Sequence, residues 1–326
     1  MAPSPPAPFR AFPLLSGPHL QTVLGSLSLF GIEPRSRILR VALPDGDALA
    51  LLISTPPRWR ADHPAALLIH GLCGSDRSPY MVRVARRLFR RGLQVVRMNL
   101  RGCGRGQGLA RNPYHSGRTE DLRAAIAAIG GEFPHSRLDV VGFSLGGNLV
   151  LKLAGEWGAD AVSRVRRFIA VCPPVDLAAS VKRFRVGRNR WYERRFVREL
   201  IQSVRRRERD FPDLARADLP PTLSLEEFDD RYTAPRCGFS GAQDYYERSS
   251  ALGFLGGISV STRILLSQDD PLVDSARLLE ARLPSGVELH ASDRGGHLGF
   301  LAAPGCRRGL RWMDHQVGEW VEEESL

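Results

Sequence analysis

Short apolar runs alternate along most of the chain with stretches whose apolar residues recur at helical spacing. The apolar runs predict strands at residues 65–69, 93–100, 137–141, 167–171, 262–266 and 287–290. The helical spacing predicts helices at residues 79–91, 121–129, 145–157, 274–283 and 308–323. This repeated strand–helix–strand order is typical of an α/β fold with a mostly parallel, doubly wound sheet. In such folds the functional residues lie at the carboxyl ends of the strands.

Two segments depart from this alternation. Residues 37–42 and 48–54 flank the turn signal Pro44-Asp45-Gly46-Asp47, which predicts a β-hairpin. The second segment, 176–257, shows no strand pattern but has helical stretches at 191–204 and 242–252, which predict a helical lid inserted after the sixth strand. The expected organisation is an N-terminal segment (1–36) packed on an α/β core (37–175 and 258–326), with the lid at 176–257.

A candidate nucleophile lies where the strand at 137–141 meets the helix at 145–157. The junction reads Gly142-Phe143-Ser144-Leu145-Gly146, which is the pattern Gly-x-Ser-x-Gly. A serine hydroxyl is a weak nucleophile unless a base activates it and a rigid backbone aims it. A sharp strand-to-helix turn exposes the hydroxyl, and the flanking glycines are needed because no Cβ fits there. The pattern therefore makes Ser144 the candidate nucleophile.

An acid and a histidine follow the serine in the order expected of one triad fold. Asp270 comes after the strand at 262–266, and His297 lies on a loop after the last strand. The order Ser…Asp…His is that of α/β-hydrolases. Two aspartates stand side by side here; Ser267 is the small residue that commonly precedes the acid by three positions, which favours Asp270 over Asp269. We expect Asp269 to bond to backbone N–H groups of the nearby loop instead.

The residues that follow the strand at 65–69 predict an oxyanion hole. They read His70-Gly71-Leu72-Cys73-Gly74. The expected donors are the backbone N–H groups of Leu72 and Leu145, which would bind a developing negative charge on oxygen. We expect His70 to hold this loop by hydrogen bonds. Cys73 lies beside it without a base of its own, which argues against a cysteine nucleophile.

Charge and cysteine content narrow the function classes. The net charge is +11, but 44 of the 46 basic residues are arginine, which indicates a codon bias more than a selected binding surface. Residues 182–209 hold eleven of these arginines, and we interpret them as a solvated helical face, with at most weak, peripheral contact with an anionic membrane.

Five scattered cysteines without a Cys-x-x-Cys pair predict free thiols, and no metal or other cofactor is implied. The proline-rich start, residues 1–8, is not expected to be a signal peptide, and we expect a cytoplasmic protein with no nucleic-acid partner.

Several motifs along nearly the whole chain resemble the YheT-like group of α/β-hydrolases. They are His19-Leu20-Gln21-Thr22, Pro44-Asp45-Gly46-Asp47, His70-Gly71-Leu72-x-Gly74-Ser75, Asn99-Leu100-Arg101-Gly102-Cys103, Tyr114-His115-Ser116-Gly117-x-Thr119-Glu120-Asp121, Gly142-Phe143-Ser144-Leu145-Gly146-Gly147-Asn148, Asp269-Asp270-Pro271 and Gly295-Gly296-His297. The resemblance implies hydrolysis of carboxylic esters, with relatives that act on acylglycerols or phospholipids or transfer acyl groups to alcohols. For the first and fifth motifs we favour a structural role, which is to hold the N-terminal segment and a loop near the strand ends.

These observations together predict a serine hydrolase of short- to medium-chain esters or acylglycerols. The expected triad is Ser144, Asp270 and His297, and a small-molecule ester is the expected partner. Two alternatives stay open: an acyltransferase in which an alcohol replaces the attacking water, and a non-catalytic scaffold that binds an acyl or lipid ligand.

Overall fold

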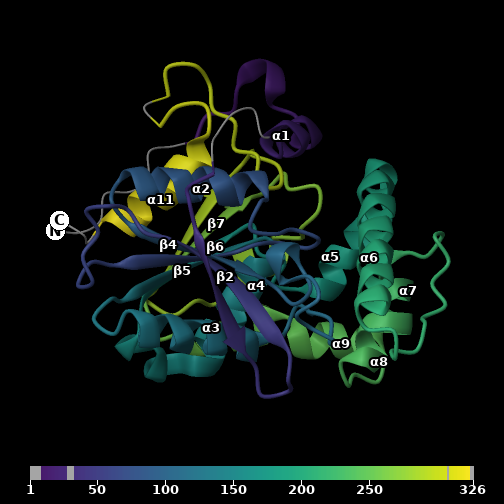
Figure 1. Ribbon diagram of the computed structural model, residues 1–326. Coiled ribbons are helices and arrows are strands. Elements are labelled where there is room, and N and C mark those ends of the chain that lie inside the picture. The colour runs from purple at the N-terminus through teal and green to yellow at the C-terminus, as the bar shows by residue number, and fades with distance from the viewer. Residues whose placement is uncertain (1–8, 28–32, 307, 324–326) are drawn as a thin grey trace.

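An eight-stranded sheet runs through the computed structural model, which describes residues 9–27, 33–306 and 308–323 (Figure 1). The strands are β1 (Arg37–Ala42), β2 (Ala48–Ser54), β3 (Ala65–Ile69), β4 (Gln94–Asn99), β5 (Leu138–Phe143), β6 (Val165–Val171), β7 (Thr262–Ser267) and β8 (Val287–Ser292). Their order across the sheet is β1-β2-β4-β3-β5-β6-β7-β8. The β1–β2 and β2–β4 pairs are antiparallel and the remaining pairs are parallel, which confirms the predicted mostly parallel sheet.

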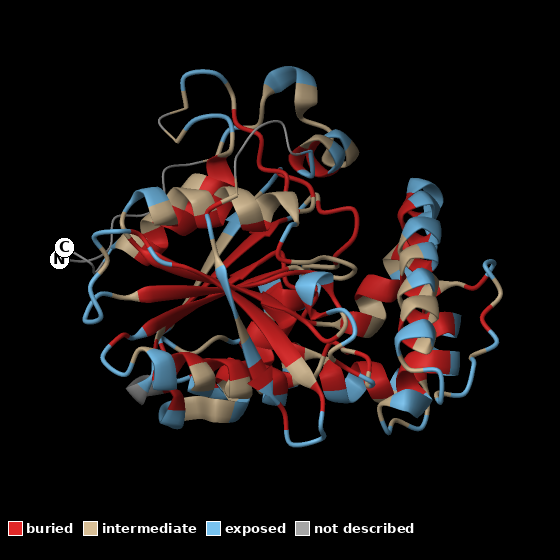
Figure 2. Ribbon diagram, in the orientation of Figure 1, coloured by how far each residue is buried: buried red, intermediate tan, exposed pale blue. Residues whose placement is uncertain are grey.

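Helices cover both faces of this sheet. Helices α2 (Pro79–Arg90) and α11 (Trp312–Glu322) pack on one face, and α3 (Thr119–Glu132) and α4 (Leu145–Trp157) on the other (Figure 1). Strand β3 illustrates why a continuous apolar run was needed, because Leu67 and Ile69 pack towards α3 and α4 whereas Leu68 packs towards α2 and α11. The central strands are accordingly buried along their length, as Figure 2 shows.

Two predicted helices are shorter than expected. Helix α10 covers only Ala276–Glu280, because the Asp274 carboxylate accepts the N–H group of Ala276 in a turn before the helix, and the backbone becomes extended at Ala281 (φ −68°, ψ 138°). Residues 308–311 also lie outside α11, since an antiparallel bridge ties Arg311 to Leu301. The prediction that the helix begins at residue 308 was therefore wrong.

A group of helices, here called the helical insertion (residues 176–257), joins β6 to β7. It contains α5 (Leu177–Phe184), α6 (Arg190–Asp210), α7 (Leu225–Phe228), the π-helical turn Asp229–Thr233, α8 (Ala234–Arg236) and α9 (Ala242–Ser249). These helices stand beside the sheet at one side of the molecule (Figure 1) and form their own apolar cluster. The sequence thus placed the insertion correctly, whereas the domain boundaries stay a prediction.

The N-terminal part described here packs against the C-terminal part of the chain. Helix α1 (Pro18–Gly25) is bonded to Leu301 and Arg311, because the Gln21 side chain accepts from Leu301 N–H and Arg311 donates to the Gly25 carbonyl. The expectation for residues 1–8 lies outside the described residues. No helix in the described ranges is both long and apolar enough to cross a membrane.

Candidate active site

The turn between β5 and α4 holds Ser144 in a strained backbone conformation. Its φ is 55° and its ψ is −122°, a region that residues with a side chain rarely occupy. A Cβ on Gly142 would lie 2.1 Å from the carbonyl oxygen of Gly146, and a Cβ on Gly146 would lie 2.5 Å from that of Ile69. Both glycines are therefore required by close backbone contacts, and the turn lifts the Ser144 hydroxyl at the carboxyl end of β5.

The structure brings the three predicted side chains together in one hydrogen-bonded row. His297 Nε2 lies 2.9 Å from Ser144 Oγ, and His297 Nδ1 lies 2.7 Å from Asp270 Oδ2. Because an ionised carboxylate only accepts, Nδ1–H donates to Asp270 and Nε2 is left to accept from the serine hydroxyl. Asp270 is buried at 2% exposure, and its other oxygen already accepts two backbone N–H groups, so the carboxylate is fixed in place.

Asp269 has the structural contacts expected of it. Its Oδ1 accepts a hydrogen bond of 2.8 Å from the backbone N–H of Gly296 and one of 2.5 Å from the Ser267 hydroxyl. The neighbouring aspartates therefore have different partners. Asp270 contacts the imidazole of His297, and Asp269 bonds the loop that carries His297 to the end of β7.

The two predicted oxyanion donors lie on either side of the serine. In the part of the chain that the structure describes, neither Leu72 N–H nor Leu145 N–H donates a hydrogen bond to another residue. The loop that carries Leu72 packs tightly on the serine, since a Cβ on Gly71 would lie 2.9 Å from Ser144 Cβ. Both amides are thus available to a substrate oxygen.

The loop around Leu72 is held by two side chains from other segments and by the ring of His70 at its own start. The Tyr80 hydroxyl accepts from Gly71 N–H, and the Tyr114 hydroxyl accepts from Cys73 N–H. His70 Nε2 accepts from Leu100 N–H, and its Nδ1 lies 2.8 Å from the Gly71 carbonyl oxygen, to which it donates. Burial lowers the pKa of His70 to about 4, so the ring is neutral and serves the loop, as predicted.

The motif His19-Leu20-Gln21-Thr22, part of the family resemblance, positions the loop that carries His297. Thr22 Oγ1 accepts a hydrogen bond of 2.9 Å from His297 N–H, and the Gln21 side chain both donates to and accepts from the backbone of Leu301. A Cβ on Gly296 would lie 2.4 Å from the Pro18 carbonyl oxygen, so the loop packs directly on α1. The structural role predicted for this motif is confirmed.

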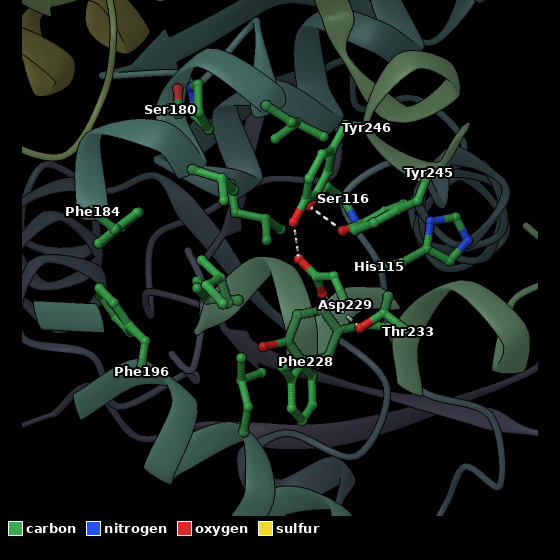
Figure 3. A pocket seen from close by; sticks show the side chains of 18 of the residues that line it. His115, Ser116, Ser180, Phe184, Phe196, Phe228, Asp229, Thr233, Tyr245 and Tyr246 are labelled. Carbon is green, nitrogen blue, oxygen red and sulfur yellow. Dashed lines mark hydrogen bonds between the residues drawn. The ribbon is translucent and has the colours of Figure 1, made fainter. Parts of the chain in front are cut away.

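A cavity opens beside Ser144 and His297 between the core loops and the helical insertion. The empty space within it, the open solvent at its mouth included, is about 940 Å³. Figure 3 shows Phe184 and Phe196 on one side of it, and Asp229, Tyr245 and Tyr246 on another. The cavity wall is therefore mostly apolar near the phenylalanines and polar around the π-helical turn.

The motif that begins Tyr114-His115-Ser116-Gly117, also part of the family resemblance, lines this cavity and is bonded to neighbouring segments. Ser116 accepts from the Tyr245 hydroxyl, and its backbone carbonyl accepts from the Asn148 side chain. Tyr114 and His115 line the cavity with it. Burial lowers the pKa of His115 to about 3, so this imidazole is neutral in the cavity wall.

Two ionisable groups of the cavity wall were not identified from the sequence. Burial raises the pKa of the Asp229 carboxyl to about 7, against which its hydrogen bonds from Thr233 and Tyr246 act. Arg207 is the other; it lies within the arginine run that we interpreted as solvated, and it is only 5% exposed. Its spacing from the apolar Leu200 and Val204 on α6 was the available signal that it faces inward.

One group of potential metal ligands overlaps the candidate triad. The ligand atoms of Cys172, Asp270 and His297 all lie within 4.8 Å of one another. Burial raises the pKa of the Cys172 thiol well above its usual range, which keeps it protonated, and the other two side chains are occupied by the hydrogen bond between them. These three side chains are therefore a hydrogen-bonded Asp270–His297 pair with a neutral thiol, that of Cys172, beside it.

Comparisons with known proteins agree with this geometry. Residues 64–304 match the family described as alpha/beta hydrolase fold. The YheT protein of Escherichia coli (strain K12) is 32% identical over 96% of this chain and 92% of its own length. The "Medium-chain fatty acid ethyl ester synthase/esterase 2" of Saccharomyces cerevisiae is 30% identical over 74% of this chain, which spans 58% of that protein.

Solved structures show the same fold at lower identity. The esterase Pf2001 of Pyrococcus furiosus superposes with a TM-score of 0.55 at 17% identity, covering 88% of this chain and 92% of that one. The 2,6-dihydroxy-pseudo-oxynicotine hydrolase superposes with a TM-score of 0.60 at 17% identity, covering 94% and 72%. With its mostly parallel sheet and its nucleophile turn, the chain therefore belongs to the α/β-hydrolase family, within the YheT-like group.

Proposed function

We propose that this protein is a serine carboxylic-ester hydrolase whose catalytic residues are Ser144, Asp270 and His297. The observation that carries the proposal is the row of two hydrogen bonds from Asp270 through His297 to Ser144, next to two unoccupied backbone donors. The family as a whole supplies hydrolases, and the assignment of roles to these residues rests on their geometry.

In the proposed reaction His297 Nε2 takes the proton of Ser144 while Oγ attacks the ester carbonyl carbon. The carbonyl oxygen becomes an oxyanion, which the N–H groups of Leu72 and Leu145 stabilise. Collapse of this intermediate breaks the bond to the alcohol, which leaves with the proton from His297, and an acyl-enzyme remains on Ser144. Water then loses a proton to His297, attacks the acyl carbon and releases the acid.

The substrates that fit the cavity are short- to medium-chain esters or acylglycerols. Its wall includes apolar residues such as Leu72, Phe184 and Phe196, which suit an acyl chain. A "Monoacylglycerol lipase" of Saccharomyces cerevisiae, 26% identical over 78% of this chain, is among the relatives and supports the same substrate class.

The test is a series of p-nitrophenyl esters of increasing chain length, assayed with the wild type and with Ser144→Ala, together with labelling by a fluorophosphonate probe. We expect labelling of Ser144 and a rate that Ser144→Ala reduces by roughly 10³-fold or more. Folded wild-type protein that takes up no label would instead support a scaffold that binds a ligand without catalysis.

A second candidate function is acyl transfer to an alcohol, which the name of the yeast synthase/esterase favours. Adding ethanol to the hydrolysis assay distinguishes the two functions. Ethyl ester formed in preference to free acid would assign the protein as an acyltransferase, because both products come from the same acyl-enzyme.

A further inference from the structure

Arg207 is a buried guanidinium in the wall of the cavity that also contains Ser144 and His297. The residue is 5% exposed. Its Nη1 donates a 2.9 Å hydrogen bond to the Tyr232 hydroxyl, whereas its Nε has no partner. Among the residues that the structure describes, no carboxylate forms an ion pair with Arg207.

Other buried arginines of this protein are paired differently. Arg97 forms an ion pair with Glu33, Arg101 with three aspartates, and Arg263 with Glu288 and Glu323. A buried charge without a counter-ion is costly, so a protein normally supplies an opposite charge or leaves the group in water. Arg207 has no such opposite charge beside it. Because it lines the substrate cavity, a bound ligand can supply the negative charge.

The surroundings of Arg207 provide further donors of the type that binds an oxyanion. Ser203 precedes it by one helical turn on α6 and also lines the cavity, so the two side chains lie on the same helical face. On the other side, a Cβ placed on Gly102 would lie 3.3 Å from Arg207 Nη2, so the guanidinium sits above the loop that follows β4. The arginine is therefore held between the helical insertion and the core.

The nearby carboxyl group of the cavity wall does not take the place of a counter-ion. Asp229 is bonded to the hydroxyls of Thr233 and Tyr246 and forms no ion pair with Arg207. Burial raises the pKa of Asp229 to about 7 and so disfavours its charged form.

We propose that Arg207 binds an oxyanion group of the substrate, so that the preferred ester carries a carboxylate or a phosphate in addition to the ester bond. The guanidinium would donate to the oxyanion, with the Ser203 hydroxyl as a second donor, while the ester carbonyl lies at Ser144. Guanidinium suits this role because its planar fork binds carboxylate and phosphate groups with two parallel hydrogen bonds. This inference rests on the proposed esterase function and specifies its substrate class.

The experiment compares matched pairs of neutral and anionic esters. For the acyl side the pair is p-nitrophenyl hexanoate and mono-p-nitrophenyl adipate, which differ by a terminal carboxylate. For the alcohol side the pair is monooctanoylglycerol and octanoyl glycerol phosphate, followed by release of octanoate. We expect wild-type kcat/KM to favour the anionic member of one pair by about tenfold or more, and that pair identifies which end of the ester carries the charge.

Substitutions on α6 test whether Arg207 is responsible. Arg207→Met should lower the ratio of kcat/KM for the anionic ester to kcat/KM for the neutral ester to about one, and Arg207→Lys should retain part of the preference. Arg209→Met, at an exposed position of the same helix, is the matched control and should keep the full preference. If Arg207→Met fails to fold, Tyr232→Phe, which removes the arginine's hydrogen-bond partner, should still reduce the preference.

Equal turnover of both members of both pairs by the wild type would overturn the inference and leave the esterase function standing. Preference for the anionic ester that persists in Arg207→Met would also overturn it. Absence of Ser144-dependent hydrolysis of the neutral esters would instead refute the proposed function itself.

Discussion

At the scale of single residues, the adjacent aspartates Asp269 and Asp270 have different hydrogen-bond partners. Asp269 and Asp270 leave the same strand, yet one carboxylate bonds to the histidine ring and the other to the backbone of the histidine loop. Both residues lie in the turn that follows β7, which directs the two carboxylates to different partners, so only Asp270 reaches the ring of His297. The backbone of His297 is also held in place, because its N–H group donates a hydrogen bond to the Thr22 hydroxyl.

The two aspartates should therefore respond differently to substitution by asparagine. We expect Asp270→Asn to keep the fold and lower kcat by up to about 10⁴-fold, because an amide facing Nδ1 favours the wrong tautomer of His297. Asp269→Asn should cost far less in rate and about 1 kcal/mol in stability, since it weakens the hydrogen bonds to Gly296 and Ser267.

Steady-state kinetics on one p-nitrophenyl ester and urea denaturation of both variants provide the measurements. A larger loss of kcat/KM in Asp269→Asn than in Asp270→Asn would show that the roles assigned to the two carboxylates are exchanged.

At the scale of elements, the π-helical turn Asp229–Thr233 is the most unusual segment of the insertion. Such turns are rare and are found often at functional sites. Here the turn directs Asp229 and Thr233 into the cavity wall, where Asp229 accepts hydrogen bonds from Thr233 and Tyr246 (Figure 3). The burial of Asp229 raises its pKa from 3.8 to about 7.

This raised pKa makes a prediction about stability and pH. A carboxyl group with a higher pKa in the folded state holds its proton more tightly there, so its contribution to stability is full below about pH 4 and is lost as the pH rises through about 7. The full loss is on the order of 4 kcal/mol, because each tenfold difference in proton affinity between the folded and unfolded states is worth about 1.4 kcal/mol. Asp229→Asn mimics the protonated form and should therefore be more stable than the wild type at pH 8, with little difference near pH 4.

Urea denaturation of both proteins at the two pH values measures this difference. The comparison isolates Asp229, because the buried His70 and His115, whose lowered pKa values make acid destabilising, are present in both proteins. A difference in unfolding free energy that is the same at both pH values would contradict the prediction.

At the scale of the whole molecule, the helical insertion is bonded to segments that are distant from it in the sequence. Arg183 donates to the Asp270 carbonyl and Asn189 to the Pro271 carbonyl, so the insertion holds the loop that carries the acid. On the N-terminal side, His19 of α1 stacks on Tyr192 of α6, with ring centroids 5.8 Å apart. The insertion is thus tied both to the triad and to the segment that supports His297.

The exposed arginines of the insertion predict a weak, salt-dependent attraction to anionic lipid. Seven of the eleven arginines at 182–209 are exposed, and the chain carries a net charge of +11. Exposed charges are screened by salt, so co-sedimentation with phosphatidylserine vesicles should be modest and should disappear at about 0.5 M salt.

A double variant, Arg194→Gln with Arg198→Gln, should lower this retention more than Arg40→Gln with Arg90→Gln, which removes the same charge far from the insertion. Binding that persists at high salt, or that is equal on neutral vesicles, would indicate hydrophobic anchoring instead.

Much of this fold could be predicted from local sequence. Strands buried on both faces need an apolar residue at nearly every position, which is why β3 was located to the residue. The glycines around Ser144 were equally informative, because close backbone contacts exclude a side chain at Gly142 and Gly146. The Ser…Asp…His order placed all three side chains at strand ends, where the structure brings them within hydrogen-bonding distance.

Other features depended on contacts between segments that are distant in sequence. Helix α11 starts late because an antiparallel bridge ties Arg311 to Leu301. The inward orientation of Arg207 was missed for a related reason. A local pattern records which residues share a helix face, but whether that face meets water or a cavity depends on what the rest of the chain packs against it, and only the tertiary structure decides that.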